Sequence, residues 1–449
     1  MESIGTSRNI VNLVISLEKF RTFQMVRNTI HWIKKLLSRK NTQPSGTLMA
    51  RMAQNQYIQL NSDVYKKGIQ QFEGNLKDIL EIAKENNIPV ILGTLACNLK
   101  DQYPFVSMNS KNYPRADIIF KQATEELKRE NISKADSLFR LAKDLDALRF
   151  RAPSEINRTI VSLANKFRDP IINIDSAFNA MSPYHIVGNN LMTDHLHPTL
   201  QGYKIIGKLF YKAMEENKLL PNTVPRNLSN EKQDSLTSVN FNFTSLDSTI
   251  GEYRIKLLKN DWPYIKKKNQ VPVNKLLQAK DYIDSLAYNL MLNKIDWEPA
   301  HRSAANYYLL TKNYSKFIDM MNALISQYPF IQEYYDFAAN KLLEAKIFDK
   351  AYFYLQGSFN IKPSDFSAKW LGIINLNKGN IESAKKFLLE SIKLNSRDAQ
   401  AWYNLAGCYV NKEDYKSALD AVNNSLKISP QYREAKVLQA QLIQALKSK

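Results

Sequence analysis

The C-terminal half of the chain repeats a pattern of small and large apolar residues with a period of about 34 residues. Equivalent alanines stand at Ala351, Ala384 and Ala418, so the spacings are 384 − 351 = 33 and 418 − 384 = 34 residues. Small residues at such points let two antiparallel helices approach closely, and larger residues fill the space between them. A chain of this kind is expected to stack helix pairs, because one pair alone cannot bury its apolar face.

This pattern resembles the tetratricopeptide repeat, and three units match it. They carry, in chain order, Tyr335, Ala338, Ala339, Ala351, Leu355, Ser358 and Pro363; Leu371, Gly372, Ala384, Leu388 and Ser391; and Trp402, Leu405, Ala406, Tyr409, Ala418, Val422, Ser425 and Pro430. A weaker unit precedes them, from about Glu298 to Pro329. The resemblance implies an all-α repeat solenoid that presents a groove to a protein or peptide partner.

Two short apolar runs interrupt the helical pattern of the N-terminal half. Residues 88–95 and 169–175 are rich in β-branched side chains, and each follows a predicted helix. Such runs are typical of buried strands in a parallel sheet. Asn98 and Asp101 would lie in the loop after the first strand, where loops build binding sites. They would contact a substrate there, or they are simply polar loop residues.

A carboxylate and an imidazole stand three residues apart in the segment 193–203. Asp194 and His197 precede Pro198, and an amphipathic run begins at Leu200, so the pair is predicted to lie on a turn. A serine hydrolase uses a pair of this kind to orient its general base. The alternative is that Asp194 and His197 are simply polar residues at a helix N-terminus, where Asp is a common cap and Pro a common first residue.

The N-terminal part resembles the SGNH (GDSL-type) hydrolases, and more closely those fused to tetratricopeptide repeats. The matching segments are Asp194-x-x-His197-Pro198 with Gly202-Tyr203, residues 88–105, Arg151-Ala152-Pro153 with Asn157, Trp262-Pro263 and Ala287-Tyr288. The resemblance implies a partial flavodoxin-like three-layer α/β fold and an ester substrate. It also implies that His197 is the general base and that Asp194 orients it, while His195 is a bystander.

Three blocks of that family are missing from the sequence. Ser3 and Ser7 lie near the start, but no Asp precedes either serine, and the family's oxyanion-hole Gly and Asn blocks are also absent. We therefore expect an ester hydrolase homologue that is an N-terminally truncated fragment and is inactive as this chain, because a base without nucleophile or oxyanion donors lowers the barrier little. The alternative is a tetratricopeptide repeat scaffold for protein–protein interaction.

Composition divides the chain into four segments. We expect a partial hydrolase-like domain over residues 1–220 and a linker rich in Ser, Thr, Asn and Pro over residues 221–245. A helical connector over residues 246–297 then leads to the repeats at residues 298–449. The hydrolase resemblance further implies a membrane-anchored, extracytoplasmic protein, although the sequence itself carries no recognisable signal or anchor.

The chain is strongly basic, with a formal net charge of +19. Its lysines are scattered over predicted helices, so we expect no nucleic-acid partner. Cys97 and Cys408 are far apart and no metal-ligand spacing is present, so we expect neither a metal nor a cofactor.

One basic segment, residues 11–37, is predicted to be helical and carries Arg21, Arg27, Lys34 and Lys35. It would lie on a membrane surface or cover a sheet or groove of the fold, and we favour the second. No segment is expected to span a bilayer.

Overall fold

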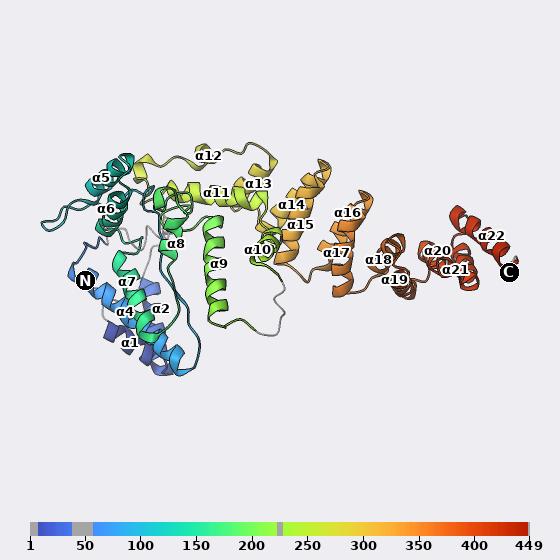
Figure 1. Cartoon of the computed structure of the whole chain (residues 1–449), viewed down its shortest axis with the longest axis horizontal. Coiled ribbons are helices and arrows are strands. Elements are labelled where there is room, and N and C mark those ends of the chain that lie inside the picture. Colours follow the sequence, from blue (N-terminus) through green and yellow to red (C-terminus); the bar gives the residue numbers. More distant parts are fainter. Residues whose placement is uncertain (1–7, 38–56, 222–227, 448–449) are drawn as a thin grey trace. The chain divides into compact units, whose positions relative to one another are not determined.

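The computed structural model describes residues 8–37, 57–221 and 228–447, and this part of the chain is mostly helical (Figure 1). The chain forms two compact units. The first consists of Met1–Asn227 with Ile255–Leu276, and the second of Leu228–Arg254 with Leu277–Lys449. The proposed four-segment division stays a prediction, although a helix, α10 (Asn230–Val239), lies within the segment expected to be a linker.

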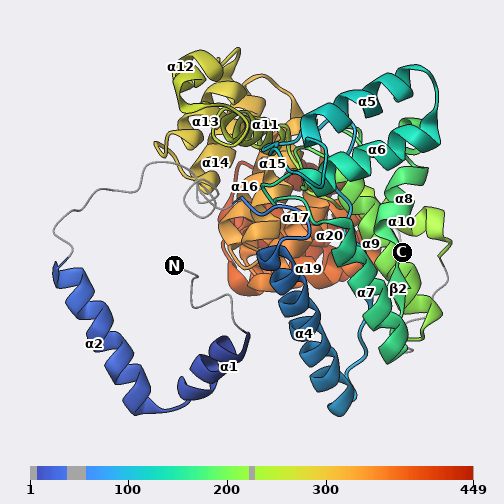
Figure 2. The ribbon, with the colours of Figure 1, turned by 90° about the vertical axis from the view of Figure 1, so that its left-hand side faces the viewer.

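The first unit is built mainly of helices and contains a very small sheet (Figure 2). Its elements are α1 (Arg8–Leu17), α2 (Arg21–Leu37), α4 (Asp63–Glu85), β1 (Leu92–Gly93), α5 (Ala116–Lys128), α6 (Ile132–Leu145), α7 (Ser154–Phe167), β2 (Ile171–Ile172), α8 (Ile174–Ala180), η2 (Pro183–His185), α9 (Leu200–Glu216), η3 (Lys267–Asn269) and α12 (Val273–Leu276). Most of the unit's core therefore comes from helices.

Both strands lie inside the apolar runs that predicted them, and they pair in parallel. Leu92 is opposite Ile171 and Gly93 is opposite Ile172. The predicted flavodoxin-like three-layer α/β fold is nevertheless not shown, because the described residues form only this pair of two-residue strands. A short run of apolar residues indicates a buried segment, but it does not show that the segment pairs as a strand. Here helices supply the burial: Ile172 packs with Ile174 and Phe178 of α8 and Ile205 of α9.

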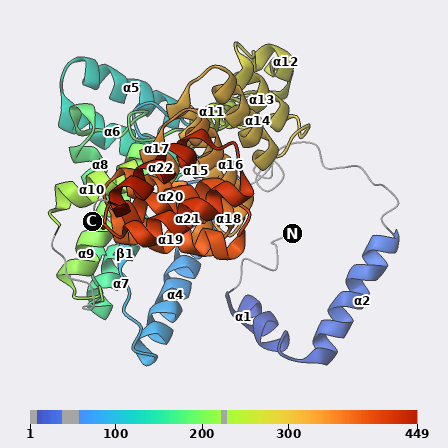
Figure 3. The same ribbon diagram turned by 90° about the vertical axis from the view of Figure 1, so that its right-hand side faces the viewer.

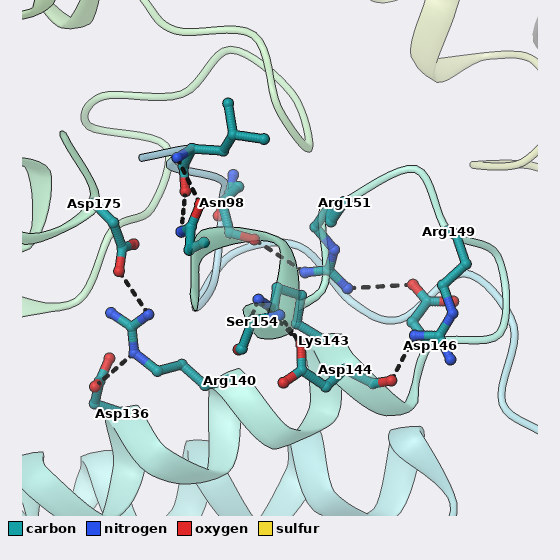
Figure 4. A network of polar contacts seen from close by, with 12 residues as sticks. Asn98, Asp136, Arg140, Lys143, Asp144, Asp146, Arg149, Arg151, Ser154 and Asp175 are labelled. Carbon is teal, nitrogen blue, oxygen red and sulfur yellow. Dashed lines mark hydrogen bonds and ion pairs between the residues drawn. The ribbon is translucent and has the colours of Figure 1, made fainter. Parts of the chain in front are cut away.

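A network of buried ion pairs joins the loop after β1 to the segments that flank α7 (Figure 4). The Arg151 guanidinium contacts the Asp146 carboxylate at 3.3 Å, and both side chains are almost completely buried. Asp146 also accepts hydrogen bonds from the backbone N–H groups of Phe105 and Val106, while Arg151 donates to the carbonyl of Asn98 at 3.0 Å. Because each group has several partners, the network can hold irregular backbone in a fixed shape.

The N-terminal helices α1 and α2 leave much of their apolar surface exposed. Leu13 and Ile15 of α1 and Met25 and Trp32 of α2 are each more than half exposed. The expectation that this segment covers a sheet or groove is therefore not met by these side chains. Within the described residues, no helix has the length and apolar character needed to cross a membrane.

The second unit contains the repeats, which stack as helix pairs (Figure 1) and are seen from their C-terminal end in Figure 3. Its helices are α10, α11 (Ser245–Lys259, whose last turn belongs to the first unit), α13 (Tyr282–Met291), α14 (Trp297–Leu310), α15 (Tyr314–Gln327), α16 (Gln332–Glu344), α17 (Phe348–Ile361), α18 (Asp365–Asn377), α19 (Ile381–Leu394), α20 (Ala399–Val410), α21 (Tyr415–Ile428) and α22 (Arg433–Lys447). The pairs α14–α15, α16–α17, α18–α19 and α20–α21 each pack closely together.

The small residues that predicted the repeats lie at the contact between the two helices of a pair. Ala351, Ala384 and Ala418 are completely buried. The serine seven residues after each alanine is also buried, and its hydroxyl bonds to the start of the first helix of the pair. Ser391 donates to the carbonyl of Asp365 at 3.1 Å and Ser425 to that of Ala399 at 2.7 Å. In the earlier pair, Ser358 donates instead to the Asp336 carboxylate at 2.6 Å.

Gly372 allows the closest approach of α18 to α19, and this generates a test of the packing. A Cβ at Gly372 would lie 2.6 Å from Cγ of Leu388, so Gly372→Ala should destabilise the second unit by roughly 1–3 kcal/mol. Gly251→Ala in α11 is the control, because nothing lies within 4 Å of its Cβ position. It should stabilise the unit by up to about 1 kcal/mol through helix propensity. Urea unfolding of both variants measures the difference, and equal stability would contradict the packing.

Candidate functional site

The sequence-predicted pair Asp194 and His197 lies on one tight turn of the first unit. Oδ2 of Asp194 is 2.6 Å from Nδ1 of His197. Its Oδ1 accepts hydrogen bonds from the backbone N–H of Leu196 at 2.8 Å and of His197 at 2.7 Å. The Asp194 carboxylate is buried while the His197 side chain is half exposed. One carboxylate therefore orders the backbone of the turn and orients an accessible imidazole.

Burial and hydrogen bonding act in opposite directions on Asp194. Burial raises the pKa of the carboxyl group, but the hydrogen bonds from the His197 backbone, the His197 ring and the Leu196 backbone outweigh it. The pKa of Asp194 is therefore lower than that of an ordinary aspartate, and the group is ionised at neutral pH.

The turn is held against the start of α9, but Asp194 does not cap that helix. The cap is Thr199, whose hydroxyl accepts from the N–H of Gly202 at 3.2 Å. A Cβ at Gly202 would lie 2.8 Å from the carbonyl oxygen of Leu191, so only glycine fits where the helix meets the turn. The alternative prediction, in which Asp194 belongs to the helix N-terminus, does not describe this arrangement.

The loop residues Asn98 and Asp101 brace the same turn. The Asn98 amide donates to the carbonyl of Asp194 at 3.2 Å and to the side chain of Asn189 at 2.9 Å. Oδ2 of Asp101 accepts from the backbone N–H of Asn189 at 2.8 Å. Their polar groups thus hold two loops together.

His195, predicted to be a bystander, is the most completely enclosed histidine of the turn. Its Nδ1 is 2.7 Å from the Tyr264 hydroxyl, and the rings of Phe105, Phe150 and Tyr264 pack around it. Its Nε2 is buried without a hydrogen-bond partner among the described residues. Burial is the main cause that lowers the pKa of His195, to about 4, so the ring is neutral at pH 7.

The turn places the His197 imidazole beside the Asp194 carboxylate. Across residues 8–37, 57–221 and 228–447, no serine or threonine hydroxyl makes a hydrogen bond to the His197 ring. The serines near the start, Ser3 and Ser7, lie outside the described residues. The roles assigned to Asp194 and His197 therefore stay predictions.

A second candidate site, which sequence reasoning missed, lies on the first helices of the repeats and at the C-cap of α20. Asn306 and Asn340 occupy equivalent positions, since 340 − 306 = 34, and so do Asn377 and Asn411, since 411 − 377 = 34. All four side chains are exposed. In the repeat, the position shared by Asn306 and Asn340 lies about one helical turn from the position shared by Asn377 and Asn411. The two positions therefore lie on the same face. We call these four residues the asparagine stripe, and their spacing in the repeat could have revealed them.

Direct links connect the first helices of neighbouring repeats. Helix α18 contacts α20 as well as its own partner α19. Lys369 of α18 forms an ion pair with Asp398, the N-cap of α20, at 2.7 Å. The Tyr334 hydroxyl of α16 donates to Glu298 of α14 at 2.6 Å. Neighbouring first helices therefore lie next to one another along the stack.

Comparison with known proteins identifies the repeats. The family model of the tetratricopeptide repeat matches residues 370–398 and 399–432. The chain therefore contains tetratricopeptide repeats, as predicted. No curated protein matches the chain in sequence.

Several solved structures are similar to part of the chain. The crystal structure of MamA protein is 17% identical over 33% of this chain and 88% of its own, with a TM-score of 0.29. MamA from Desulfovibrio magneticus RS-1 is 13% identical over 34% of this chain and 98% of its own, with a TM-score of 0.29. YrrB, described as a TPR protein with an unusual peptide-binding site, is 19% identical over 51% of this chain and 97% of its own, with a TM-score of 0.30.

The expectation of an SGNH-type ester hydrolase homologue is wrong. The family model that matches is that of the tetratricopeptide repeat, and the described chain forms helices rather than the layered sheet that such an enzyme requires. The turn alone brings the side chains of Asp194 and His197 together, so their contact does not require a hydrolase fold. Because the hydrolase assignment is wrong, nothing supports an ester substrate.

The enclosure of His195 predicts a pH dependence of stability. The folded chain binds a proton at His195 only near pH 4, while the unfolded chain does so below about pH 6.5. Protons therefore favour the unfolded state, and stability should fall by up to about 3 kcal/mol as the pH drops from 6.5 to 4. His195→Gln should weaken this dependence, because glutamine can bond to Tyr264 but does not titrate.

The control is His185→Gln, since His185 is exposed on η2. Urea unfolding of the full chain, monitored by hydrogen exchange of first-unit peptides, is measured at several pH values. It gives the slope of the free energy of unfolding against pH for each variant. An unchanged slope in His195→Gln, or an equal change in both variants, would contradict the assignment.

Proposed function

We propose that the protein is a scaffold whose tetratricopeptide repeats bind a peptide segment of a protein partner. The observation that carries this proposal is the family match over residues 370–432, set within a continuous stack of helix pairs from α14 to α21. Stacked repeats build extended surfaces suited to elongated ligands. The peptide-binding site named in the description of YrrB supports the same class of ligand.

The asparagine stripe gives this surface a defined chemistry. A side-chain amide donates and accepts hydrogen bonds, as a peptide group does, so a row of exposed amides is suited to an extended backbone. Asn340 bonds to Glu344 one turn away at 2.9 Å, and Asn411 bonds to the carbonyl of Gly407 at 2.8 Å. These local bonds hold the amides in place while leaving them exposed to a ligand.

Selection from a random peptide library on the full chain tests the proposal. Selected peptides should lose about tenfold in affinity for Asn340→Ala/Asn377→Ala, since two hydrogen bonds of about 0.5–1.5 kcal/mol each are removed. Gln356→Ala/Asn360→Ala, at exposed positions of the second helix α17, is the matched control and should bind normally. Fluorescence anisotropy measures each dissociation constant. Failure to enrich any peptide, or equal losses in both variants, would refute the proposal.

A further inference from the structure

The N-terminal helices α1 and α2 carry an apolar face that the rest of the described chain leaves uncovered. Val26, Ile30 and Ile33 recur at helical spacing on α2 and fall within an arc of about 60°. They are 44–54% exposed. Met25 and Trp32, which are 71% and 63% exposed, lie outside this arc, on the side of Arg21 and Asn28. Large side chains of this kind are rarely left in water over a continuous helix face.

The opposite face of α2 is polar, which makes the helix strongly amphipathic. Arg21, Gln24 and Asn28 are exposed there, while Arg27 forms an ion pair with Glu18 in the link between α1 and α2. The two helices and their link contain a single acidic residue, Glu18, against six lysines and arginines in the sequence. The segment is therefore a cationic helix pair with a large apolar surface.

We propose that α1 and α2 bind the surface of an anionic lipid bilayer, with the apolar face of α2 inserted at the level of the headgroups. An interfacial helix of this type combines a basic polar face with bulky apolar residues.

Charge argues for lipid rather than a second copy of the chain as the occupant. Two copies of α2 packed through their apolar faces would bring together segments of the same positive sign. An anionic bilayer both neutralises this charge and covers the apolar face. The inference concerns the first unit and does not depend on peptide binding by the repeats.

Flotation of the full chain with lipid vesicles tests the proposal. The chain should float with vesicles of phosphatidylcholine and phosphatidylglycerol, and less with phosphatidylcholine alone. Val26→Asp/Ile30→Asp should reduce the bound fraction at least about tenfold, because it places charge on the inserted face. Gln24→Asp/Asn28→Asp adds the same two charges at the same spacing on the polar face, and it should reduce binding by less than about threefold.

A second measurement does not depend on the variants. Hydrogen exchange of residues 21–33 in the wild-type chain should slow when the anionic vesicles are added. Absence of flotation by the wild-type chain would overturn the proposal, as would equal losses in the two variants. A dimer in sedimentation without lipid, dissociated by Val26→Asp/Ile30→Asp and accompanied by no flotation, would show that a second copy covers this face instead.

Discussion

The close contact between the two helices of each repeat is the interaction on which the second unit depends. Ala351, Ala384 and Ala418 are completely buried there, and a larger side chain would separate the helices. The buried serine that follows each alanine supplies a hydrogen bond across the same contact. Close packing thus places the two backbones near enough for a polar bond, and an unpaired buried hydroxyl would be costly. The distance between the two helices of each pair therefore sets the geometry of the stack and of any surface on it.

The first unit is stabilised differently, through carboxylates buried in irregular backbone. Asp146 accepts from two consecutive backbone N–H groups and pairs with Arg151, and Asp194 accepts from two others and from the His197 ring. Each carboxylate satisfies donors that no strand or helix would satisfy, which is why long loops can be packed here. The same arrangement explains why an Asp–His pair can form without serving a reaction.

Prediction from sequence succeeded where a contact recurs or is local. The repeats were recognised because one packing contact returns every 33 or 34 residues, and the Asp194–His197 pair formed because three residues of chain bring the two side chains together. The three-layer fold is not shown, because strand pairing is a long-range property that an apolar run does not determine. In residues 169–175, Ile172 packs on helices α8 and α9, while in residues 88–95 Ile88 and Leu95 are exposed. The asparagine stripe was overlooked because attention rested on the apolar positions of the repeat, although the same period relates Asn306 to Asn340.

The positive net charge of the chain indicates a particular kind of partner only when it is considered together with the exposed apolar surface. A net charge of +19 is compatible with many anionic partners. Several cations of the repeats are engaged in ion pairs with nearby carboxylates, such as Lys369 with Asp398 and Lys378 with Asp349, so their charge is locally balanced. In the sequence of residues 8–37 the cations outnumber the single Glu18, and α2 exposes an apolar face. Since a phosphate backbone would leave that face in water, a lipid surface satisfies both features where a nucleic acid satisfies only one.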